Sequence, residues 1–274
     1  IPGVPGSLGG KKITGICEDK NGDLWLSIYS AGIDKYDRAS GTFIHYTNIF
    51  SAAASTGSSN INGIGVDGTG VLWACGFGTS LATFDYEKNK FTNKGGGGWL
   101  RGLFTDSEGW LWILQNDPGI SVYVPVENKI IGFPPDKNDL TKPGTGVIGS
   151  IAEDKWGTIW MGTETGMYSF NKTTKFFTRY KNIPSDTNSL TNNSVDALAY
   201  YNDVLWIATG GGLDAYSISE KFFRHFKQNI FGINTVIAAI SQDENKNLTG
   251  VEVAKIRSKI LKTLQGKFNA ALKE

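Results

Sequence analysis

A short sequence recurs five times along this chain, and the repeat constrains the fold more than any other feature. Each copy holds an apolar residue, an acidic or polar turn and a tryptophan that follows Leu or Ile, as in IAEDKWGTIW over 151–160. A Gly or small residue and an aromatic residue come next, and most copies end in a strand-like segment such as KFFTRY over 175–180. The repeat tryptophans are spaced 39–48 residues apart and are Trp25, Trp73, Trp112, Trp160 and Trp206.

Each repeat is long enough for four short strands separated by turns. The Asp-x-x-Gly turn before the tryptophan suits a tight hairpin, because Asp accepts hydrogen bonds from backbone amides and Gly adopts positive φ. Four-stranded units with this period predict an all-β chain folded as a β-propeller, with five recognisable blades and a partial sixth. We expect each repeat tryptophan on the second strand of its blade, packed between neighbouring blades, where its burial contributes at most about 5 kcal/mol.

Composition supports this class of fold and excludes some functions. The chain is 40% hydrophobic with 35 glycines, which favours short strands and tight turns. Its 27 basic and 26 acidic residues give a net charge of +1, so we expect no nucleic-acid partner. No apolar run reaches the roughly 18 residues of a membrane-spanning helix, and IPGVPGSLGG over 1–10 is not a signal peptide. Cys17 and Cys75 fit no metal or redox spacing and are expected to be buried thiols.

The most regular copy resembles a known repeat family. SIAEDKWGTIWMGTETGMYSFNKTTKFFTRYKNIPSDTNSLTNNSV over 150–195 is similar to the repeat of the two-component regulator propeller family. The resemblance covers roughly residues 13–228, although Ser80 replaces the Gly of the second repeat and GGGGWL over 95–100 replaces the Pro-Asp-Ser-Leu linker. The family supplies extracytoplasmic sensor regions of hybrid histidine kinases. The resemblance therefore implies a periplasmic or extracellular sensor.

The repeat pattern weakens toward the C-terminus. Residues 235–249 begin a sixth repeat in which Thr249 stands at the tryptophan position. The apolar residues that follow are spaced by three or four and predict an amphipathic helix over 251–274, which Thr249 could cap. This helix could lie on the propeller, lead to another domain or partner helix, or bind a membrane surface. We divide the chain into an N-terminal extension (1–12), the blades (13–228), a degenerate sixth repeat (229–250) and the helical tail (251–274).

Residues suited to catalysis are scarce. The two histidines, His45 and His225, fall at equivalent outer-strand positions of the first and fifth repeats, where the fourth repeat has Arg179. The acidic pairs 18–19 and 153–154 recur in phase, which favours a role in turns over paired-carboxylate chemistry. No cluster has metal-ligand spacing, and neither glycine run has the sequence of a phosphate-binding loop. We therefore expect no enzyme activity, no metal and no cofactor.

A binding surface is better supported than an active site. Trp99, Trp110 and Trp156 fall outside the repeat register, so blade packing does not require them and we expect them to be exposed. Loops that open on the usual ligand face of a propeller hold further candidates. Aromatic rings beside amide and carboxylate groups suit sugars, which stack one face and hydrogen-bond through their hydroxyls. The candidate ligand-binding residues are Trp99, Tyr29, Phe77, Gln115, Asn116, Asp117 and Glu164. Trp99 could instead plug the central channel or seal a blade edge.

These observations predict a non-catalytic sensor or recognition propeller of a two-component regulatory system. Its expected partner is an oligosaccharide or a protein, and it could form a homodimer through the propeller or the C-terminal helix. Two other functions stay open. One is a propeller enzyme resembling the streptogramin lyases, which also carry Asp-x-x-Gly-x-Leu-Trp repeats. The other is a structural or secretion-associated scaffold.

Overall fold

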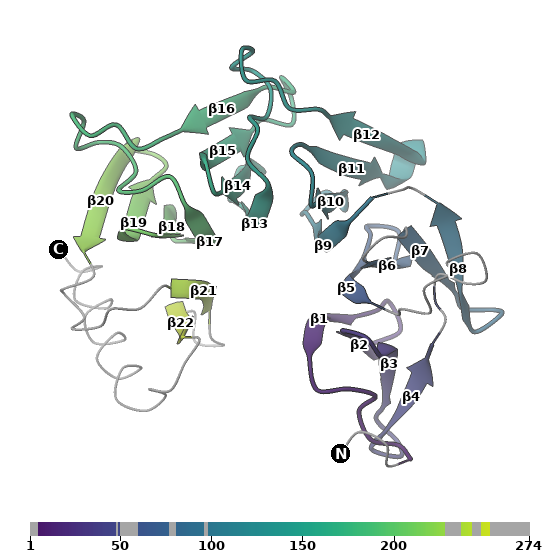
Figure 1. Ribbon diagram of the computed structural model, residues 1–274. Coiled ribbons are helices and arrows are strands. Elements are labelled where there is room, and N and C mark those ends of the chain that lie inside the picture. The colour runs from purple at the N-terminus through teal and green to yellow at the C-terminus, as the bar shows by residue number, and fades with distance from the viewer. Residues whose placement is uncertain are drawn as a thin grey trace. The chain divides into compact units, whose positions relative to one another are not determined.

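The structure, a computed structural model, consists of β-strands joined by turns and linkers (Figure 1). It describes residues 5–47, 49, 60–76, 81–95, 98–227, 237–242 and 248–252. Within these ranges the one helical element is a three-residue 3₁₀ turn, η1 (Pro125–Glu127). The chain divides into two compact units, residues 1–133 and 134–274, and each is described by itself.

The first unit contains three antiparallel four-stranded sheets, which we call blades 1 to 3. Consecutive strands are neighbours in every sheet, which is the topology of a propeller blade. Blade 1 comprises β1 (Ile13–Glu18), β2 (Leu24–Ile28), β3 (Gly32–Asp37) and β4 (Thr42–Tyr46). Blade 2 comprises β5 (Ile61–Val66), β6 (Leu72–Gly76), β7 (Leu81–Asp85) and β8 (Lys90–Gly95). Blade 3 comprises β9 (Leu100–Thr105), β10 (Leu111–Gln115), β11 (Ile120–Val124) and β12 (Lys129–Phe133).

The second unit contains two further blades of the same topology and one strand pair. Blade 4 comprises β13 (Ile148–Glu153), β14 (Ile159–Thr163), β15 (Gly166–Phe170) and β16 (Phe177–Tyr180). Blade 5 comprises β17 (Val195–Tyr201), β18 (Val204–Thr209), β19 (Gly212–Ser217) and β20 (Phe222–Lys227). The pair is β21 (Ile237–Gln242) and β22 (Leu248–Glu252). The five four-stranded sheets predicted from the repeats are confirmed.

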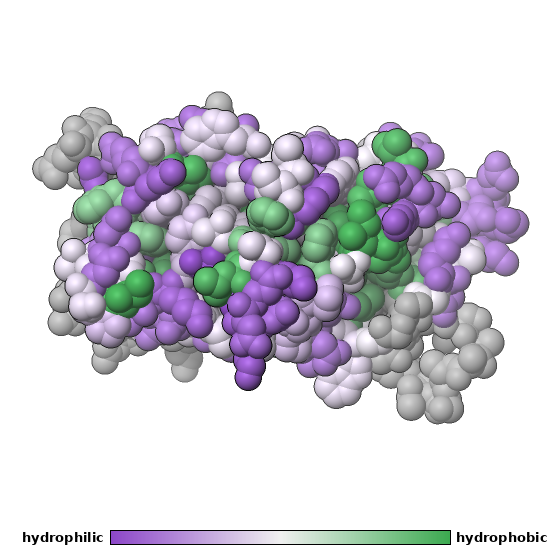
Figure 2. Space-filling view, turned by 90° about the horizontal axis from the view of Figure 1, so that it is seen from above, coloured by the Kyte–Doolittle hydropathy of each residue, from purple (hydrophilic) through white to green (hydrophobic). Residues whose placement is uncertain are grey.

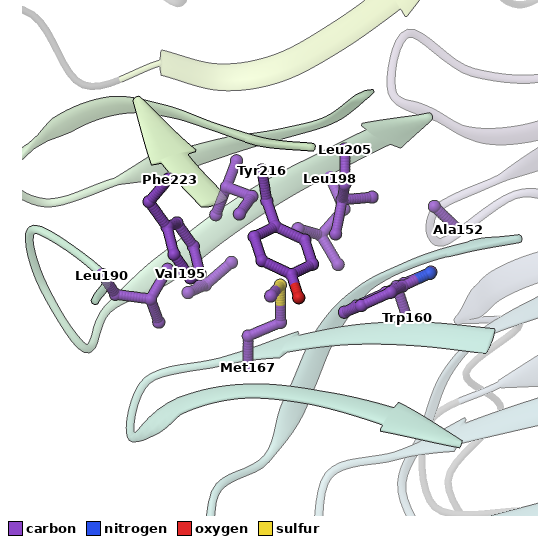
Figure 3. Packing of buried hydrophobic residues seen from close by; sticks show 10 residues of the cluster. Ala152, Trp160, Met167, Leu190, Val195, Leu198, Leu205, Tyr216 and Phe223 are labelled. Atoms are coloured by element: carbon purple, nitrogen blue, oxygen red, sulfur yellow. The ribbon is translucent and has the colours of Figure 1, made fainter. Parts of the chain in front are cut away.

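Every repeat tryptophan lies on the second strand of its blade, as predicted. The five indoles are at most 6% exposed. In the first unit, the Trp25 ring contacts Phe84 of blade 2 at a centroid distance of 4.7 Å, and Trp73 contacts Tyr123 of blade 3 at the same distance. In the second unit, Trp160 of blade 4 and Tyr216 of blade 5 enclose a buried cluster with Met167 (Figure 3). The hydrophobic contacts between these blades are therefore made largely by the repeat aromatics.

A hydrogen bond between aspartate and tryptophan recurs in four blades. In each, one oxygen of the turn aspartate accepts the backbone N–H groups two and four residues later, and the other accepts the indole N–H six residues later. The indole bonds are 2.7–2.9 Å long and join Asp19 to Trp25, Asp67 to Trp73, Asp106 to Trp112 and Asp154 to Trp160. In blade 5, Tyr200 stands six residues before Trp206. The turn aspartates thus both build the hairpin and satisfy a buried indole.

The hydrogen bonds around Asp19 predict loss of stability in acid. Burial alone would raise the pKa of this carboxyl, but donors from Trp25, from the backbone of Asn21 and Asp23 and from Tyr86 outweigh it and lower the pKa. Because the folded pKa lies below the unfolded one, this stabilisation is complete above about pH 4 and is lost as pH falls through the folded pKa. We expect Asp19→Asn to be less stable than wild type at pH 7, with the gap shrinking at pH 3. Urea unfolding at both pH values measures this, and a gap independent of pH would contradict it.

The end of the chain differs in part from the prediction. Thr249 lies in β22 and pairs with Ser241 of β21. Each repeat tryptophan likewise pairs with a residue on the first strand of its blade, as Trp25 does with Cys17. This pairing is in register with the repeat, whereas the predicted role of Thr249 as a helix cap is wrong because the strand continues past it. The helix expected over 251–274 is wrong at Val251 and Glu252, which continue β22 because they pair with β21. Residues 253–274 lie outside the described part.

Arginine and histidine side chains on outer strands hold linkers to their blades. The Arg179 guanidinium on β16 donates to backbone carbonyls between Asp136 and Pro143. His225 on β20 bonds the Thr187 carbonyl and the buried Asp214 carboxylate, both at 2.8 Å. These equivalent repeat positions therefore secure the long linkers before β13 and β17.

Candidate functional site

An open pocket of about 400 Å³ lies in the first unit. It is formed by the beginnings of β1, β5 and β9, the first strands of the three blades, and by the loop after β10. The residues that line it are Thr14, Asn62, Trp99, Leu100, Arg101 and Asn116.

A register shift at the start of each first strand places polar residues at this pocket. Thr14, Asn62 and Arg101 are each skipped in the pairing with the second strand of their blade. The same shift recurs at Gly149, Asp196 and Ala238 in the second unit, so it is a property of the repeat. A bulge of this kind re-aims a side chain at the end of a strand. In the first unit it presents a hydroxyl, an amide and a guanidinium to one pocket.

Glycines after the bulged residues allow β5 and β9 to approach each other closely. A Cβ atom added at Gly63 would lie 2.9 Å from the Cα of Gly102, closer than side-chain atoms tolerate. The close approach lets the Asn62 amide donate to the Leu100 carbonyl across the two blades at 2.8 Å. The pocket therefore lies where two blades are in direct backbone contact.

The segment Trp99–Arg101 is held in place on several sides. Leu100 is 4% exposed and packs with Trp73 and Leu111 in the core between blades 2 and 3. The Asn116 N–H donates to the Trp99 carbonyl at 2.7 Å. Trp99 and Arg101 flank buried Leu100, and both side chains are exposed at the pocket. The backbone thus presents an aromatic ring and a cation from a fixed segment.

Several polar groups in the pocket are available to a ligand. Arg101 is exposed and makes no hydrogen bond or ion pair with the described residues. Asn62 uses its amide nitrogen for Leu100, which leaves its side-chain oxygen as an acceptor. Trp99 is 50% exposed, so part of its indole can stack on a ligand. The pocket combines a planar apolar surface with donors and acceptors.

The structure brings together only some of the predicted site residues. Trp99 and Asn116 line the pocket, half-buried Gln115 pairs with Leu100, and Asp117 is exposed beside Asn116. Tyr29 is 39% exposed in the β2–β3 turn, where the Lys12 ammonium lies 4.4 Å from its ring centroid. Glu164 belongs to the second unit and accepts from the Val147 N–H. Phe77 lies outside the described residues.

The other two off-register tryptophans differ from each other. Trp156 is 54% exposed, as expected, and Lys155 lies over its ring. Trp110 is half-buried, so the expectation that it would be exposed is wrong in part.

On the face shown in Figure 2, hydrophilic residues predominate and hydrophobic residues form separate patches.

Sequence reasoning did not single out Thr14, Asn62 or Arg101. Each follows the first apolar residue of an inner strand and precedes a glycine, in ITG, ING and LRG. This shared sequence position was the signal that could have identified the three residues. Its meaning depends on a register shift between strands, which repeat alignment alone does not reveal.

The two histidines bind carboxylates on the outer part of their blades. His45 Nδ1 lies 2.7 Å from Asp34 Oδ1 between β4 and β3, and His225 repeats this arrangement with Asp214 between β20 and β19. The second oxygen of each aspartate accepts a backbone N–H from a neighbouring segment, at Gly9 and at Thr191. The pairs connect outer strands to linkers, in line with the predicted structural role.

Metal-ligating side chains and thiols are further reactive groups in the described part of the chain. No group of three or more His, Cys, Asp or Glu side chains there could hold a metal ion. Burial raises the pKa of the Cys17 and Cys75 thiols to about 12, so both stay protonated at neutral pH. No helix among the described residues combines the length and the hydrophobicity that crossing a bilayer requires.

Comparison with protein families identifies the repeat. A model described as "Two component regulator propeller" matches residues 7–30 and 142–165, the segments that lead into β1 and β13 and continue past Trp25 and Trp160. The chain carries two-component regulator propeller repeats. Comparison with curated protein sequences gives no match.

Solved structures share the fold of this repeat protein at low sequence identity. One is the extracellular domain of BT4673 from B. thetaiotaomicron, described in one structure as part of a one-component and in another as part of a hybrid two-component system. The two structures give TM-scores of 0.68 and 0.67 at 19% and 21% identity, covering 92% and 89% of this chain. They are covered over only 36% and 33% of their own length, so the chain spans about a third of that domain.

Other propellers of different function are similar in fold as well. PorZ, a surface component of the type-IX secretion system of Porphyromonas gingivalis, gives a TM-score of 0.67 at 14% identity, with 87% of this chain and 37% of PorZ covered. Virginiamycin B lyase from Staphylococcus aureus gives 0.63 at 14% identity, with 90% and 82% covered. These likenesses concern the fold alone, so function has to be argued from the site.

Proposed function

We propose that this chain is a recognition part of an extracytoplasmic sensor in a two-component regulatory system, and that it binds an oligosaccharide at the pocket of Trp99. The family match supports the sensor role. The observation that supports an oligosaccharide as the ligand is the half-exposed Trp99 ring, which shares one pocket with Asn62, Arg101 and Asn116. A pyranose stacks one face on an indole while its hydroxyls exchange hydrogen bonds with amides and guanidinium groups.

The fixed backbone of the pocket favours binding over catalysis. Buried Leu100 and the hydrogen bonds of Asn62 and Asn116 hold Trp99 and Arg101 before a ligand arrives, which lowers the entropy lost on binding. The two histidines pair with Asp34 and Asp214 in the outer strands of their blades, and neither histidine lines the pocket. A sensor needs selective binding without turnover, and the pocket supplies groups for that purpose.

Replacing Trp99 with alanine tests the proposal. We expect Trp99→Ala to weaken binding of the recognised oligosaccharide by about tenfold or more, equivalent to about 1.4 kcal/mol, because the stacking surface is lost. Isothermal titration calorimetry against a panel of oligosaccharides measures this. Trp156→Ala is the matched control, since Trp156 is exposed to a similar degree but lies in a turn of the other unit. The proposal fails if no member of a broad panel binds the wild type, or if Trp99→Ala binds as tightly.

A further inference from the structure

The pocket of Trp99 contains one charged group. Of the six described residues that line it, Arg101 alone is ionised at neutral pH. Its guanidinium is exposed and makes no hydrogen bond or ion pair with the described part of the chain. Arg179, by contrast, uses its guanidinium to hold linker carbonyls. Hydrogen bonds to the described residues therefore explain why an arginine stands at position 179, but they do not explain the arginine at position 101.

We propose that the ligand is an acidic saccharide whose carboxylate or sulfate group binds Arg101. This inference rests on the proposed function and names the ligand class for the same pocket. A guanidinium presents parallel N–H donors that match the two oxygens of a carboxylate, and such charge-assisted pairs are stronger than neutral hydrogen bonds.

The arrangement along β9 suits one acidic sugar ring. Trp99 and Arg101 flank buried Leu100, and both line the pocket. A ring stacked on Trp99 would direct its anionic substituent toward Arg101. The Asn62 oxygen and the Asn116 amide remain for the hydroxyls. The stacking surface, the cation and the amides are thus matched to different parts of one uronic acid or sulfated sugar.

Charges at the edge of the pocket are mixed. Lys12 lies two residues before Thr14, with its ammonium over the Tyr29 ring, and Asp117 follows Asn116 directly. These two residues carry charges of opposite sign. The preference for an anion is therefore assigned to Arg101 itself, which makes it testable by a single substitution.

The experiment compares acidic disaccharides with their neutral counterparts by isothermal titration calorimetry. The probes are digalacturonate, a glucuronate-containing disaccharide and a sulfated disaccharide, each paired with its carboxyl-reduced or desulfated form. For wild type, we expect at least one acidic probe to bind about tenfold or more tightly than its neutral form, with affinity falling as NaCl rises. Arg101→Ala should abolish this preference, because it should weaken binding of the acidic form by about tenfold more than binding of the neutral form.

Arg38→Ala is the matched control. Arg38 is also an exposed arginine of the first unit, but it bonds the Gly22 carbonyl outside the pocket, so its removal should leave the preference intact. Arg101→Ala should melt at the wild-type temperature because Arg101 bonds no described residue. Equal binding of acidic and neutral probes by wild type, or an unchanged preference in Arg101→Ala, would overturn the inference and leave saccharide binding standing. Failure of every saccharide to bind wild type would instead overturn the proposed function.

Discussion

Replacing Trp25 with alanine is expected to lower the free energy of unfolding by about 3–5 kcal/mol. Trp25 is fully buried, and its ring contacts Tyr46 of its own blade and Phe84 and Phe91 of blade 2. Its removal leaves a cavity between two blades and takes away a hydrogen-bond donor from Asp19. Large-to-small substitutions of buried tryptophan cost this much because the surrounding core relaxes only in part. Urea unfolding followed by circular dichroism measures the change.

Trp156→Ala provides the control for this prediction. The residue type and the substitution are the same, but Trp156 is 54% exposed and outside the repeat register. Surface substitutions of this kind change stability by about 0.5 kcal/mol or less. If the two variants lost similar amounts of stability, the assignment of Trp25 to blade packing would be wrong.

Replacing Asp67 with alanine is expected to cost about 2–4 kcal/mol. Asp67 is 4% exposed and accepts four hydrogen bonds, from the backbone of Thr69 and Val71, the Thr69 hydroxyl and the Trp73 indole. Its loss opens the β5–β6 turn and leaves the Trp73 N–H without its acceptor in the core. An unsatisfied buried donor costs about 1–3 kcal/mol, and the broken turn adds to this. The same urea experiment measures the effect.

Asp117→Ala is the comparison for Asp67. Asp117 is exposed in the loop after β10 and accepts no hydrogen bond from the described residues. We expect its removal to leave stability within about 0.5 kcal/mol of wild type. A loss in Asp67→Ala no greater than in Asp117→Ala would contradict the role given to the turn aspartates.

The repeat made most of the fold predictable. The tryptophan spacing located the second strand of each blade, and the Asp-x-x-Gly turn located the hairpin before it, where Gly22 has a φ of 79°. The hydrogen bond that the Trp25 indole donates to Asp19 was not foreseen, although aspartate six residues before tryptophan recurs in four repeats. That contact depends on the hairpin folding the two side chains together. Near Thr249 the repeat signal fades, and the helical period predicted over 251–274 includes Val251 and Glu252, which continue β22.

The candidate site was less predictable than the fold. Trp99 stood out because the repeat did not require it, and Asn116 because loops after a repeat tryptophan share a face. Arg101 and Asn62 gave no such signal, since their positions in the pocket depend on a one-residue register shift and on contact between β5 and β9. Contacts between strands of different blades are properties of packing, and periodicity within one blade does not contain them.

The central claim is that this chain has two kinds of tryptophan, one buried and bonded to turn aspartates and the other exposed at its surface. Hydrogen–deuterium exchange of the indole N–H groups, read from ¹H–¹⁵N spectra, tests the claim directly. We predict slow exchange for Trp25, Trp73, Trp112 and Trp160, whose indoles are buried and bonded to aspartate, and fast exchange for Trp99 and Trp156. Indoles of the first group that exchange as rapidly as that of Trp99 would contradict the claim.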